Sequence, residues 1–233
     1  MLSILTLGFL IGMRHALEAD HVAAVASLAS GSKSIRETIF HGAVWGLGHT
    51  LALMAIGSLV IVMNSSVPEG LAHWLEFTVG VMLVVLGADV IHRVVRDRVH
   101  FHFHRHSSQG RAHLHAHSHR GEGKHAKSAH EHTHNKSLTA RVLAVGLMHG
   151  MAGSAALVVL VAGTITTTMT AILYMALFGF GSIVGMAALS AVIAVPLRYS
   201  AASMTWAYNG VQAVVGIGTL SLGLYTMYSF GLA

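Results

Sequence analysis

The stretch LSILTLGFLIGMRHALEADHVAAVASLAS, residues 2–30, combines a long apolar segment with a dense group of ionisable residues. This segment is long enough for a membrane-spanning helix, which needs about 20 mostly apolar residues. However, its middle contains the polar motif RHALEADH, residues 14–21. A charged side chain at the centre of a bilayer costs about 2.5–3.5 kcal/mol on insertion scales, so such residues are functional by default. We therefore expect a membrane protein with a polar site inside its first span.

The composition of the whole chain agrees with a membrane protein. Of the 233 residues, 54% are hydrophobic and only 10% are charged, whereas soluble domains carry about 25% charged residues. No Lys or Arg precedes Arg14, so we interpret the first span as a retained helix and not as a cleaved signal. We predict an all-α membrane protein with six transmembrane helices, at 2–30, 37–63, 71–95, 139–163, 168–196 and 203–230.

The basic residues predict the orientation of these spans. Of 14 Lys and Arg residues, Arg14 lies inside the first span and the other 13 fall on the side that carries 31–36, 96–138 and 197–202. Because Lys and Arg are enriched in cytoplasmic loops, this side is predicted to be cytoplasmic. Both termini would then face outward across the inner (plasma) membrane.

The two halves of the chain resemble each other. GLGHTLALMAI at 46–56 resembles GFGSIVGMAAL at 179–189, and EFTVG at 76–80 resembles QAVVG at 212–216. His15 would then correspond to His149. Since each half holds three spans, the second would be inverted, a common design in transporters. The alternative is chance similarity between helices rich in Gly, Ala and Val.

The polar residues of the first span are candidate metal ligands. The chain contains no cysteine, so a metal site must use imidazole, carboxylate, amide or backbone groups. In a continuous helix, His15, Glu18 and His21 share one stripe because steps of three advance by about 300°. Asp20 lies about 100° away from His21 and would bind metal only if the helix bends, or would orient a histidine instead.

Histidines on two further spans lie at a comparable depth. His49 and His149 come out roughly 16–18 Å from the cytoplasmic end of their spans at about 1.5 Å per residue, close to His15 and His21. His41 is shallower, two turns from His49 on the cytoplasmic side. The candidate metal ligands are therefore His15, Glu18, Asp20, His21, His49 and His149. Such ligands suit Ni²⁺, Co²⁺, Zn²⁺ or Fe²⁺. The alternative is that these groups pair with one another to hold the helices together.

A polar loop at 97–137 contains twelve of the 19 histidines, mostly in alternating His-x-His tracts. No apolar core is available there, so we expect disorder, and such tracts bind metal through neutral imidazole. The alternative is a passive linker. We expect three parts in the chain: a three-helix membrane repeat at 1–96, the cytoplasmic loop at 97–137 and a second repeat at 138–233.

The polar motifs resemble those of the nickel/cobalt transporter family. His15, Asp20 and His21 fit its His-x4-Asp-His signature, and Leu47-Gly-His-Thr50 resembles its second motif. The resemblance covers the first two spans and implies permeation of Ni²⁺ or Co²⁺ through a site that includes these histidines and Asp20. The chain departs from the family in having Glu18 where an Asp is typical and six spans where eight are usual. It therefore looks like a compact branch, similar to nickel permeases of the urease-accessory type.

We expect transport, most directly uptake, and no enzymatic activity or resident cofactor. The expected partners are the divalent ion, the lipid bilayer and a cytoplasmic metallochaperone, with no nucleic acid. Efflux of the same ions is an alternative, because a cytoplasmic histidine loop could also collect ions for export. A membrane-embedded metalloenzyme is a second alternative, although the membrane histidines are few and deep for a di-iron enzyme.

Overall fold

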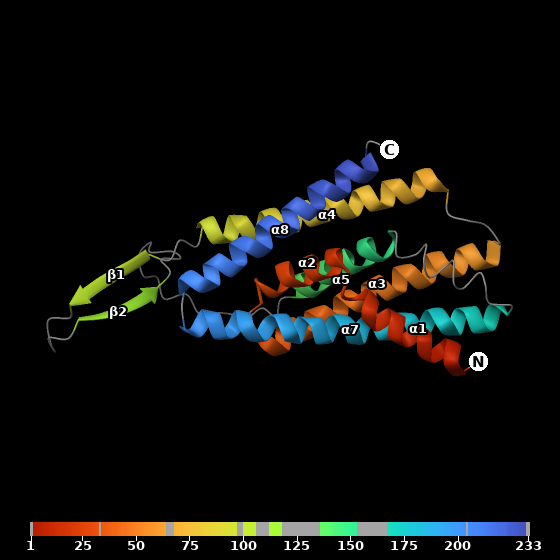
Figure 1. Cartoon of the computed structure of the whole chain (residues 1–233), viewed down its shortest axis with the longest axis horizontal. Coiled ribbons are helices and arrows are strands. Elements are labelled where there is room, and N and C mark those ends of the chain that lie inside the picture. The colour runs from red at the N-terminus through yellow and green to blue at the C-terminus, as the bar shows by residue number, and fades with distance from the viewer. Residues whose placement is uncertain are drawn as a thin grey trace.

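The computed structural model describes residues 2–32, 34–63, 68–96, 100–105, 112–117, 136–152, 167–203 and 205–231. This part of the chain is a bundle of helices with one two-stranded hairpin at its end (Figure 1). The helices are α1 (Leu2–His15), α2 (Ala19–Ala29), α3 (Ile35–Met63), α4 (Glu69–Arg96), α5 (Lys136–Gly150), α7 (Thr168–Ser203) and α8 (Thr205–Gly231). The strands are β1 (His100–Arg105) and β2 (Ala112–His117).

Four of these helices are long and apolar enough to cross a membrane. They contain the candidate spans Ile35–Val60, Glu69–Arg96, Thr168–Leu197 and Tyr208–Gly231. Each has at least 24 residues, more than the number that covers the hydrocarbon core of a bilayer. The chain is therefore a helical membrane protein, and four of the six predicted spans correspond to single long helices.

The first predicted span, 2–30, is not one helix. α1 ends at His15 and α2 begins at Ala19, with a turn between them that is held by hydrogen bonds from the Leu17 and Glu18 amides to the Arg14 and His15 carbonyls. At Glu18 the backbone is extended, with φ −65° and ψ 149°. The apolar residues on both sides favour a continuous span, but the ionisable residues are better accommodated where the backbone opens. Broken helices of this kind are tolerated at membrane depth where they line a polar site.

The helix of the fourth predicted span, 139–163, ends before the span does. α5 ends at Gly150, and Met151 and Ala152 form a turn and a bend. The Met151 and Ala152 amides donate to the carbonyls of Met148 and His149, three residues back, which tightens the helix end. The remainder of the prediction, 153–163, lies outside the described residues. These two helix ends fall at His15 and just after His149, the residues that the sequence comparison pairs.

The helices pack in two groups that α2 connects. α4 lies along α8 in one layer, while α3 lies against α7 and α5, and α7 lies against α1 (Figure 1). α2 touches α7 on one side and α4 and α8 on the other. Its buried face joins a core that includes Trp45, Leu83 and Met186. α2 therefore contacts both groups, which also touch each other where α7 meets α8 and α5 meets α4.

Glycines bring α3 and α5 unusually close. A Cβ atom at Gly146 would collide with the carbonyl of Trp45, and one at Gly150 would collide with the carbonyl of His49. Small residues allow this backbone approach in membrane helix pairs. As a result, the last turn of α5 carries His149 directly beside His49.

The loop at 97–137 contains secondary structure that the prediction of disorder did not include. β1 and β2 pair antiparallel, with His100 opposite His117, His102 opposite His115 and His104 opposite His113. The His-x-His alternation has the period of two that suits a strand. The backbone register therefore aligns six loop histidines in three cross-strand pairs, and the rest of the loop lies outside the described residues.

Candidate metal centre

Four histidines from four helices meet at the interruption between α1 and α2. His15 ends α1, His21 is in the first turn of α2, His49 is in the middle of α3 and His149 is in the last turn of α5. Their rings lie close together in edge-on or tilted arrangements, with centroids 4.3 Å apart for His15–His21 and for His21–His149 and 5.2 Å apart for His15–His49. All four side chains are buried. The fold therefore assembles an imidazole cluster from residues as far apart as 15 and 149.

Two groups of ligand atoms within this cluster are close enough to share one ion. One side-chain nitrogen of each of His15, His21 and His49 lies within 4.8 Å of the other two, and the same holds for the ligand atoms of Asp20, His21 and His149. The Nε2 atoms of His15 and His49 are 3.3 Å apart. Two nitrogens bound at about 2.1 Å to one tetrahedral ion would be about 3.4 Å apart. These two nitrogens thus have a spacing that suits two ligands of a single ion.

Glu18 contacts Nδ1, the second ring nitrogen of His15. The Nδ1 atom of His15 lies 2.9 Å from Oε1 of Glu18. Because an ionised carboxylate accepts hydrogen bonds only, this contact places the proton on Nδ1 and leaves Nε2 with its lone pair toward His49. A carboxylate behind a ligating histidine fixes the tautomer and makes the imidazole more basic. Glu18 therefore has the position of a residue that orients a ligand.

Asp20 joins two of the histidines through its two oxygens. Oδ1 lies 2.9 Å from Nδ1 of His21, and Oδ2 lies 2.9 Å from Nε2 of His149. Oδ1 also accepts the backbone amide of His21 at 2.8 Å, at the start of α2, where an acidic residue is favoured by the helix dipole. The angular argument against Asp20 assumed a continuous helix. The break at 16–18 removes this assumption and brings the carboxylate into the cluster.

The opposite nitrogens of these rings carry no hydrogen bond within the described chain. Nε2 of His21, Nδ1 of His49 and Nδ1 of His149 are buried without such a partner. Buried polar atoms are nearly always satisfied, and unpaired ones need an explanation. With their protons turned toward Asp20, His21 and His149 present lone pairs. A set of buried imidazole lone pairs backed by carboxylates is the donor set of a site for a divalent transition metal.

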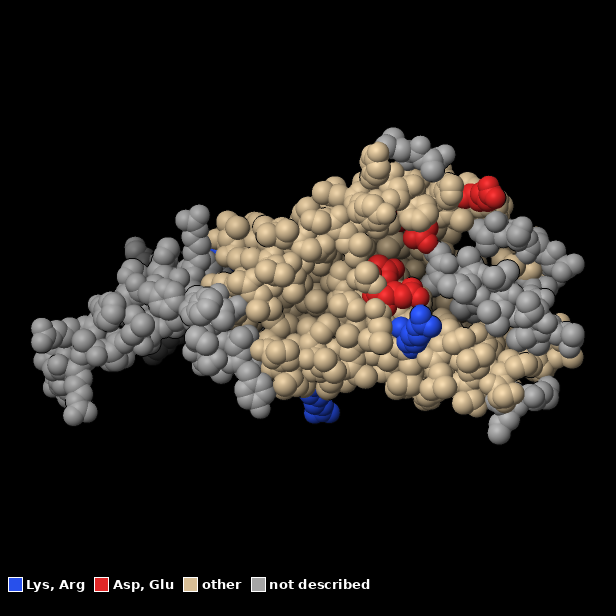
Figure 2. Space-filling view, viewed as in Figure 1, with Lys and Arg blue, Asp and Glu red and all other residues tan. Residues whose placement is uncertain are grey.

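The carboxylates form the exposed side of this otherwise buried site. Glu18 and Asp20 are 50% and 34% exposed, whereas His49 is fully buried. Figure 2 shows acidic side chains at the surface near the middle of one face of the molecule, with a basic side chain beside them. An ion reaching the histidines from this face would therefore meet negative charge first.

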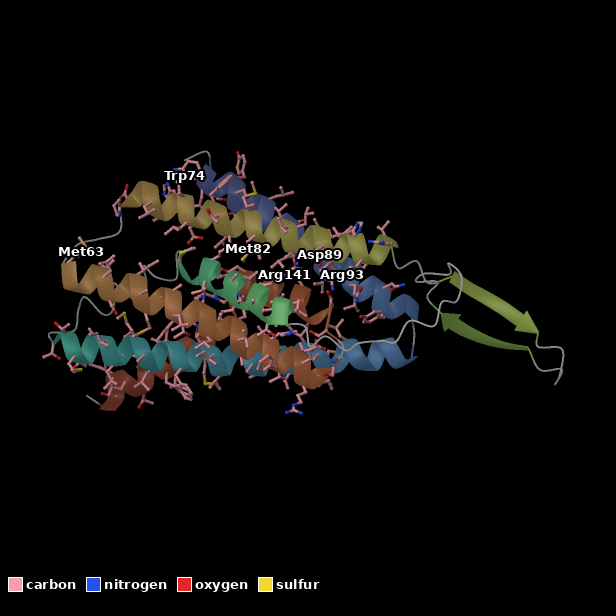
Figure 3. The ribbon with its side chains drawn as sticks, turned by 180° about the vertical axis from the view of Figure 1, so that it is seen from behind. Met63, Trp74, Met82, Asp89, Arg93 and Arg141 are labelled. Carbon is pink, nitrogen blue, oxygen red and sulfur yellow. The ribbon has the colours of Figure 1, made fainter. Side chains whose placement is uncertain are left out.

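Polar contacts also fix the other end of α2. Ser27 Oγ lies 3.0 Å from Thr219 Oγ1 of α8, and Gln212 Nε2 donates to the Ser30 carbonyl at 3.2 Å. Arg93 of α4, at the hairpin end of that helix (Figure 3), donates to Ser30 Oγ at 3.2 Å. The bond from Gln212 satisfies a carbonyl that the helix end leaves without an intrahelical partner. Together, these bonds attach the helix that carries Asp20 and His21 to the α4–α8 layer.

All six predicted ligand residues lie in or at the edge of this cluster, and that they bind metal remains a prediction. The structure adds Trp45, whose ring centroid lies 5.5 Å from that of His21 and 5.3 Å from that of His149. Trp45 stands one helical turn before His49, and this i, i+4 spacing could have placed it beside the cluster from the sequence alone. Asp89 is not part of the site, because it pairs with Arg93 at 3.1 Å near the end of α4.

Comparison with known proteins gives three relatives. The chain is 33% identical over 232 residues to the urease accessory protein UreH of Bacillus sp. (strain TB-90). This alignment covers 100% of this chain and 93% of the relative. It is 26% identical over 231 residues to the chloroplast protein FOR GROWTH AND FERTILITY 1 of Arabidopsis thaliana, covering 97% of this chain and 60% of that protein. The chloroplast protein FOR GROWTH AND FERTILITY 2 of the same plant is 35% identical over 83 residues, which is 35% of this chain and 22% of that protein.

The other comparisons give no match. No family model matches the chain, and no solved structure is significantly similar to it. The relative with the highest coverage is an accessory protein, and this chain likewise is not an enzyme. An identity of 33% over the full length of the chain establishes a common family. The chain therefore belongs to the family of the urease accessory protein UreH.

Proposed function

We propose that this protein carries Ni²⁺ across the membrane, in the direction of uptake, through the histidine cluster between α1 and α2. The observation that carries the proposal is the set of three buried histidines, His15, His21 and His49, whose ligand nitrogens lie within 4.8 Å of one another. Nickel is favoured as the ion by two arguments. The sequence motifs resemble those of nickel/cobalt transporters, and the family includes a urease accessory protein. Co²⁺ is the second ion expected, because it prefers similar ligands.

The ligand set suits a transported ion, which must be released from the site after it binds. Imidazole nitrogens bind Ni²⁺ and Co²⁺ well, but the cluster contains no thiolate, which would hold a soft or borderline ion more tightly. Glu18 and Asp20 contribute negative charge and orient the histidines without enclosing the site. We infer that Asp20 serves mainly through His21 and His149, and Glu18 mainly through His15. No resident cofactor is needed in this scheme.

We further infer that the two halves of the chain are inverted repeats of three spans each. The contacts of α1 with α7 support this, since they resemble those of α5 with α3. Gly12 packs against the carbonyl of Phe178, and Gly146 packs against the carbonyl of Trp45. Gly12 and Gly146 each stand three residues before the paired histidines, and Trp45 and Phe178 directly precede the aligned segments.

The aromatic contacts follow the same correspondence. The ring centroids of His15 and Phe178 are 5.3 Å apart, and those of His149 and Trp45 are also 5.3 Å apart. Both pairs join a broken helix to the long helix of the other half. An inverted repeat of this kind places a site at its pseudo-twofold axis, near the membrane midplane.

The α4–α8 pair supports the repeat independently. Gly80 packs against the Gly223 carbonyl, and Gly87 against the Gly216 carbonyl. The aligned segments pair Gly80 with Gly216, and Gly87 with Gly223. Exchange of the two halves therefore converts each of these contacts into the other.

The histidine loop belongs to the inner end of the proposed pathway. The predicted orientation places both termini outside and the loop at 97–137 in the cytoplasm of a cell with this protein in its plasma (inner) membrane. There the loop would receive ions from the central site and pass them to a metallochaperone. Efflux is the second candidate direction, since the same loop could collect ions. Cells that express the protein should accumulate more Ni²⁺ if it is an importer and less if it is an exporter.

The decisive test is Ni²⁺ flux into liposomes that contain the purified protein and a trapped metal-sensitive dye. We expect saturable influx with the wild type, and with His21→Ala a loss of at least about tenfold in rate at limiting Ni²⁺. The matched control is His73→Ala, because His73 is a membrane histidine on α4 whose ring contacts Phe230, away from the cluster. Equal flux in the wild type and His21→Ala would disprove the site, and Zn²⁺ measured in parallel would report its selectivity.

A further inference from the structure

His49 differs from the other three histidines of the cluster because none of its ring nitrogens contacts a carboxylate of the described chain. Each of the other three has a carboxylate oxygen at 2.9 Å from one ring nitrogen. Nε2 of His49 faces His15, but its Nδ1 is buried without a hydrogen-bond partner. Histidines that bind a metal almost always donate their second N–H to an acceptor. A loaded site therefore needs an acceptor beside Nδ1 of His49.

Ser182 of α7 carries a hydroxyl group that is also buried and unpaired. The side chain is 0% exposed, and its Oγ has no hydrogen-bond partner in the part of the chain that the structure describes. Buried polar groups are nearly always paired, so an unpaired one needs an explanation. Within a membrane, no solvent water replaces the missing bond. The hydroxyl is therefore available to a polar atom of the histidine cluster that lies near it.

The contacts of α7 with α3 bring this serine to the level of His49. A Cβ atom at Gly46 would lie 2.9 Å from Cα of Ile183, and Thr50 Oγ1 donates to the Gly179 carbonyl at 3.0 Å. His49 lies between the two contact residues of α3, and the serine lies between the two contact residues of α7. The two side chains therefore leave their antiparallel helices at the same level of the contact.

Ser182 also faces the end of α1 that carries His15. Phe178, one turn before the serine on α7, has its ring centroid 5.3 Å from that of His15. Met186, one turn after the serine, belongs to the buried cluster that contains Ala16. Because residues four apart share one face of a helix, the serine points into the same space, where α1, α3 and α7 meet. The histidine cluster lies in this space.

The proposed repeat gives a second argument for this position. The aligned segments at 46–56 and 179–189 pair His49 with Ser182. Two residues that a twofold axis exchanges face each other when both lie close to the axis. His15 and His149, which the same axis exchanges, both lie in the cluster. The serine hydroxyl therefore has, in the second half of the chain, the position that the imidazole of His49 has in the first.

We propose that Ser182 is a positioning residue of the histidine cluster, whose Oγ accepts the Nδ1–H of His49 when a divalent transition-metal ion is bound to Nε2. This inference rests on the proposed function. The His49 ring keeps one proton throughout: the proton is on Nε2, toward His15, in the ion-free site and on Nδ1 in the loaded site. A rotation of Ser182 about χ1, which has three staggered positions, aims Oγ at Nδ1 without a movement of α7.

A hydroxyl group suits a histidine that must also release its ion. An ionised carboxylate accepts hydrogen bonds only, so it would keep the proton on Nδ1 of His49 in both states. Hydrogen bonds to a charged group are also roughly twice as strong as those between neutral groups. The neutral hydroxyl of Ser182 leaves His49 able to donate from Nε2 to His15 in the ion-free site, which favours release of the ion.

The test is calorimetric titration of the purified full chain with Ni²⁺ in detergent, with Ser182→Ala introduced into three backgrounds. In the wild type we expect a loss of about tenfold in Ni²⁺ affinity, as for other groups that orient a metal ligand. In His49→Ala, which lacks the proposed partner, the serine change should have no further effect. In His149→Ala, which weakens the site but keeps His49, the loss should remain about tenfold. Ser190→Ala, which removes another buried hydroxyl without a described partner from α7, is the matched control and should bind like the wild type.

The outcomes separate this proposal from the proposed function itself. Wild-type affinity in Ser182→Ala would overturn the positioning role. An equal loss in the wild-type and His49→Ala backgrounds would also overturn it, because the hydroxyl would then act through packing or on the ion directly. A similar loss in Ser190→Ala would attribute the effect to any buried hydroxyl of α7 and contradict the proposal. Absence of Ni²⁺ binding by the wild type would instead disprove the central site. Circular dichroism and elution from size exclusion in detergent would show which variants fold.

Discussion

The Nε2 atoms of His15 and His49 face each other at 3.3 Å across the junction between α1 and α3. Nδ1 of His15 lies 2.9 Å from Oε1 of Glu18, and the His49 side chain is fully buried. With the His15 proton on Nδ1, Nε2 of His49 can donate a hydrogen bond to Nε2 of His15. A bound metal ion would take the place of that proton between the two nitrogens.

The first prediction concerns this pair. His15→Ala and His49→Ala should each lower Ni²⁺ affinity by at least about tenfold, because each removes one nitrogen of the three-histidine group. The double variant should lose much less than the product of the two single effects, since the residues act as one unit. Flux in liposomes and thermal stabilisation by Ni²⁺ in detergent would measure this. Full additivity of the two losses would indicate that the histidines do not share an ion.

The second prediction tests Asp20 as the residue that joins His21 and His149. Asp20→Asn has the same shape, but its amide offers one acceptor oxygen where the carboxylate offers two. One of the two histidines must then lose its hydrogen bond or change tautomer. We expect Ni²⁺ affinity to fall about 10- to 100-fold, the usual effect of removing a group that orients a metal ligand.

The control for Asp20 is Glu69→Gln, which removes an exposed carboxylate at the first turn of α4. This variant should bind Ni²⁺ and transport it like the wild type. If both variants lost affinity equally, the effect would come from the overall charge of the protein and not from the bridge between the two histidines.

The third prediction separates the two possible roles of Glu18. Glu18→Gln can still accept the hydrogen bond from His15 through its amide oxygen, so an orienting role predicts a loss of Ni²⁺ affinity clearly smaller than that of His15→Ala. Glu18→Ala removes the acceptor and should cost clearly more. If Glu18 binds the ion directly, Glu18→Gln should be as severe as His15→Ala. Titration of the three variants with Ni²⁺ decides between these roles.

The sequence predicted which residues meet, but not how the backbone allows it. The six ligand candidates were found because ionisable groups are rare in apolar spans, and they lie together in the structure. The interruption between His15 and Ala19 was not predicted, since the apolar residues on both sides favour a continuous helix. For this reason Asp20 was assigned an unfavourable angle, although it makes hydrogen bonds with two histidines.

The close packing of α3 against α5 could likewise not be predicted from the sequence. The approach of α3 and α5 depends on which glycines face each other, and many glycines of this chain could have served. Only the structure shows that Gly146 and Gly150 contact the carbonyls of Trp45 and His49. The hairpin at 100–117 was missed for a different reason, because the polarity of the loop was weighted above the period of its histidines.

The fourth prediction tests this close helix approach. Gly146→Ala introduces a methyl group against the carbonyl of Trp45 and should destabilise the protein by about 1–3 kcal/mol, the usual cost of overpacking. Gly218→Ala on α8 is the matched control, because a Cβ there meets no atom within 4 Å. It should be neutral or stabilising, since Ala is the better helix former. Thermal unfolding in detergent compares the two, and a stable Gly146→Ala would contradict the packing described here.

The fifth prediction concerns orientation in the membrane. Because the chain contains no cysteine, a single introduced cysteine gives an unambiguous label. Glu69 and Arg96 are exposed residues at opposite ends of α4. In intact cells, Glu69→Cys should react with a membrane-impermeant maleimide and Arg96→Cys should not, and permeabilisation should make both reactive. The physical reason is the distribution of Lys and Arg, which orients the hairpin end of α4 toward the cytoplasm. The reverse labelling pattern would place the histidine loop outside the cell.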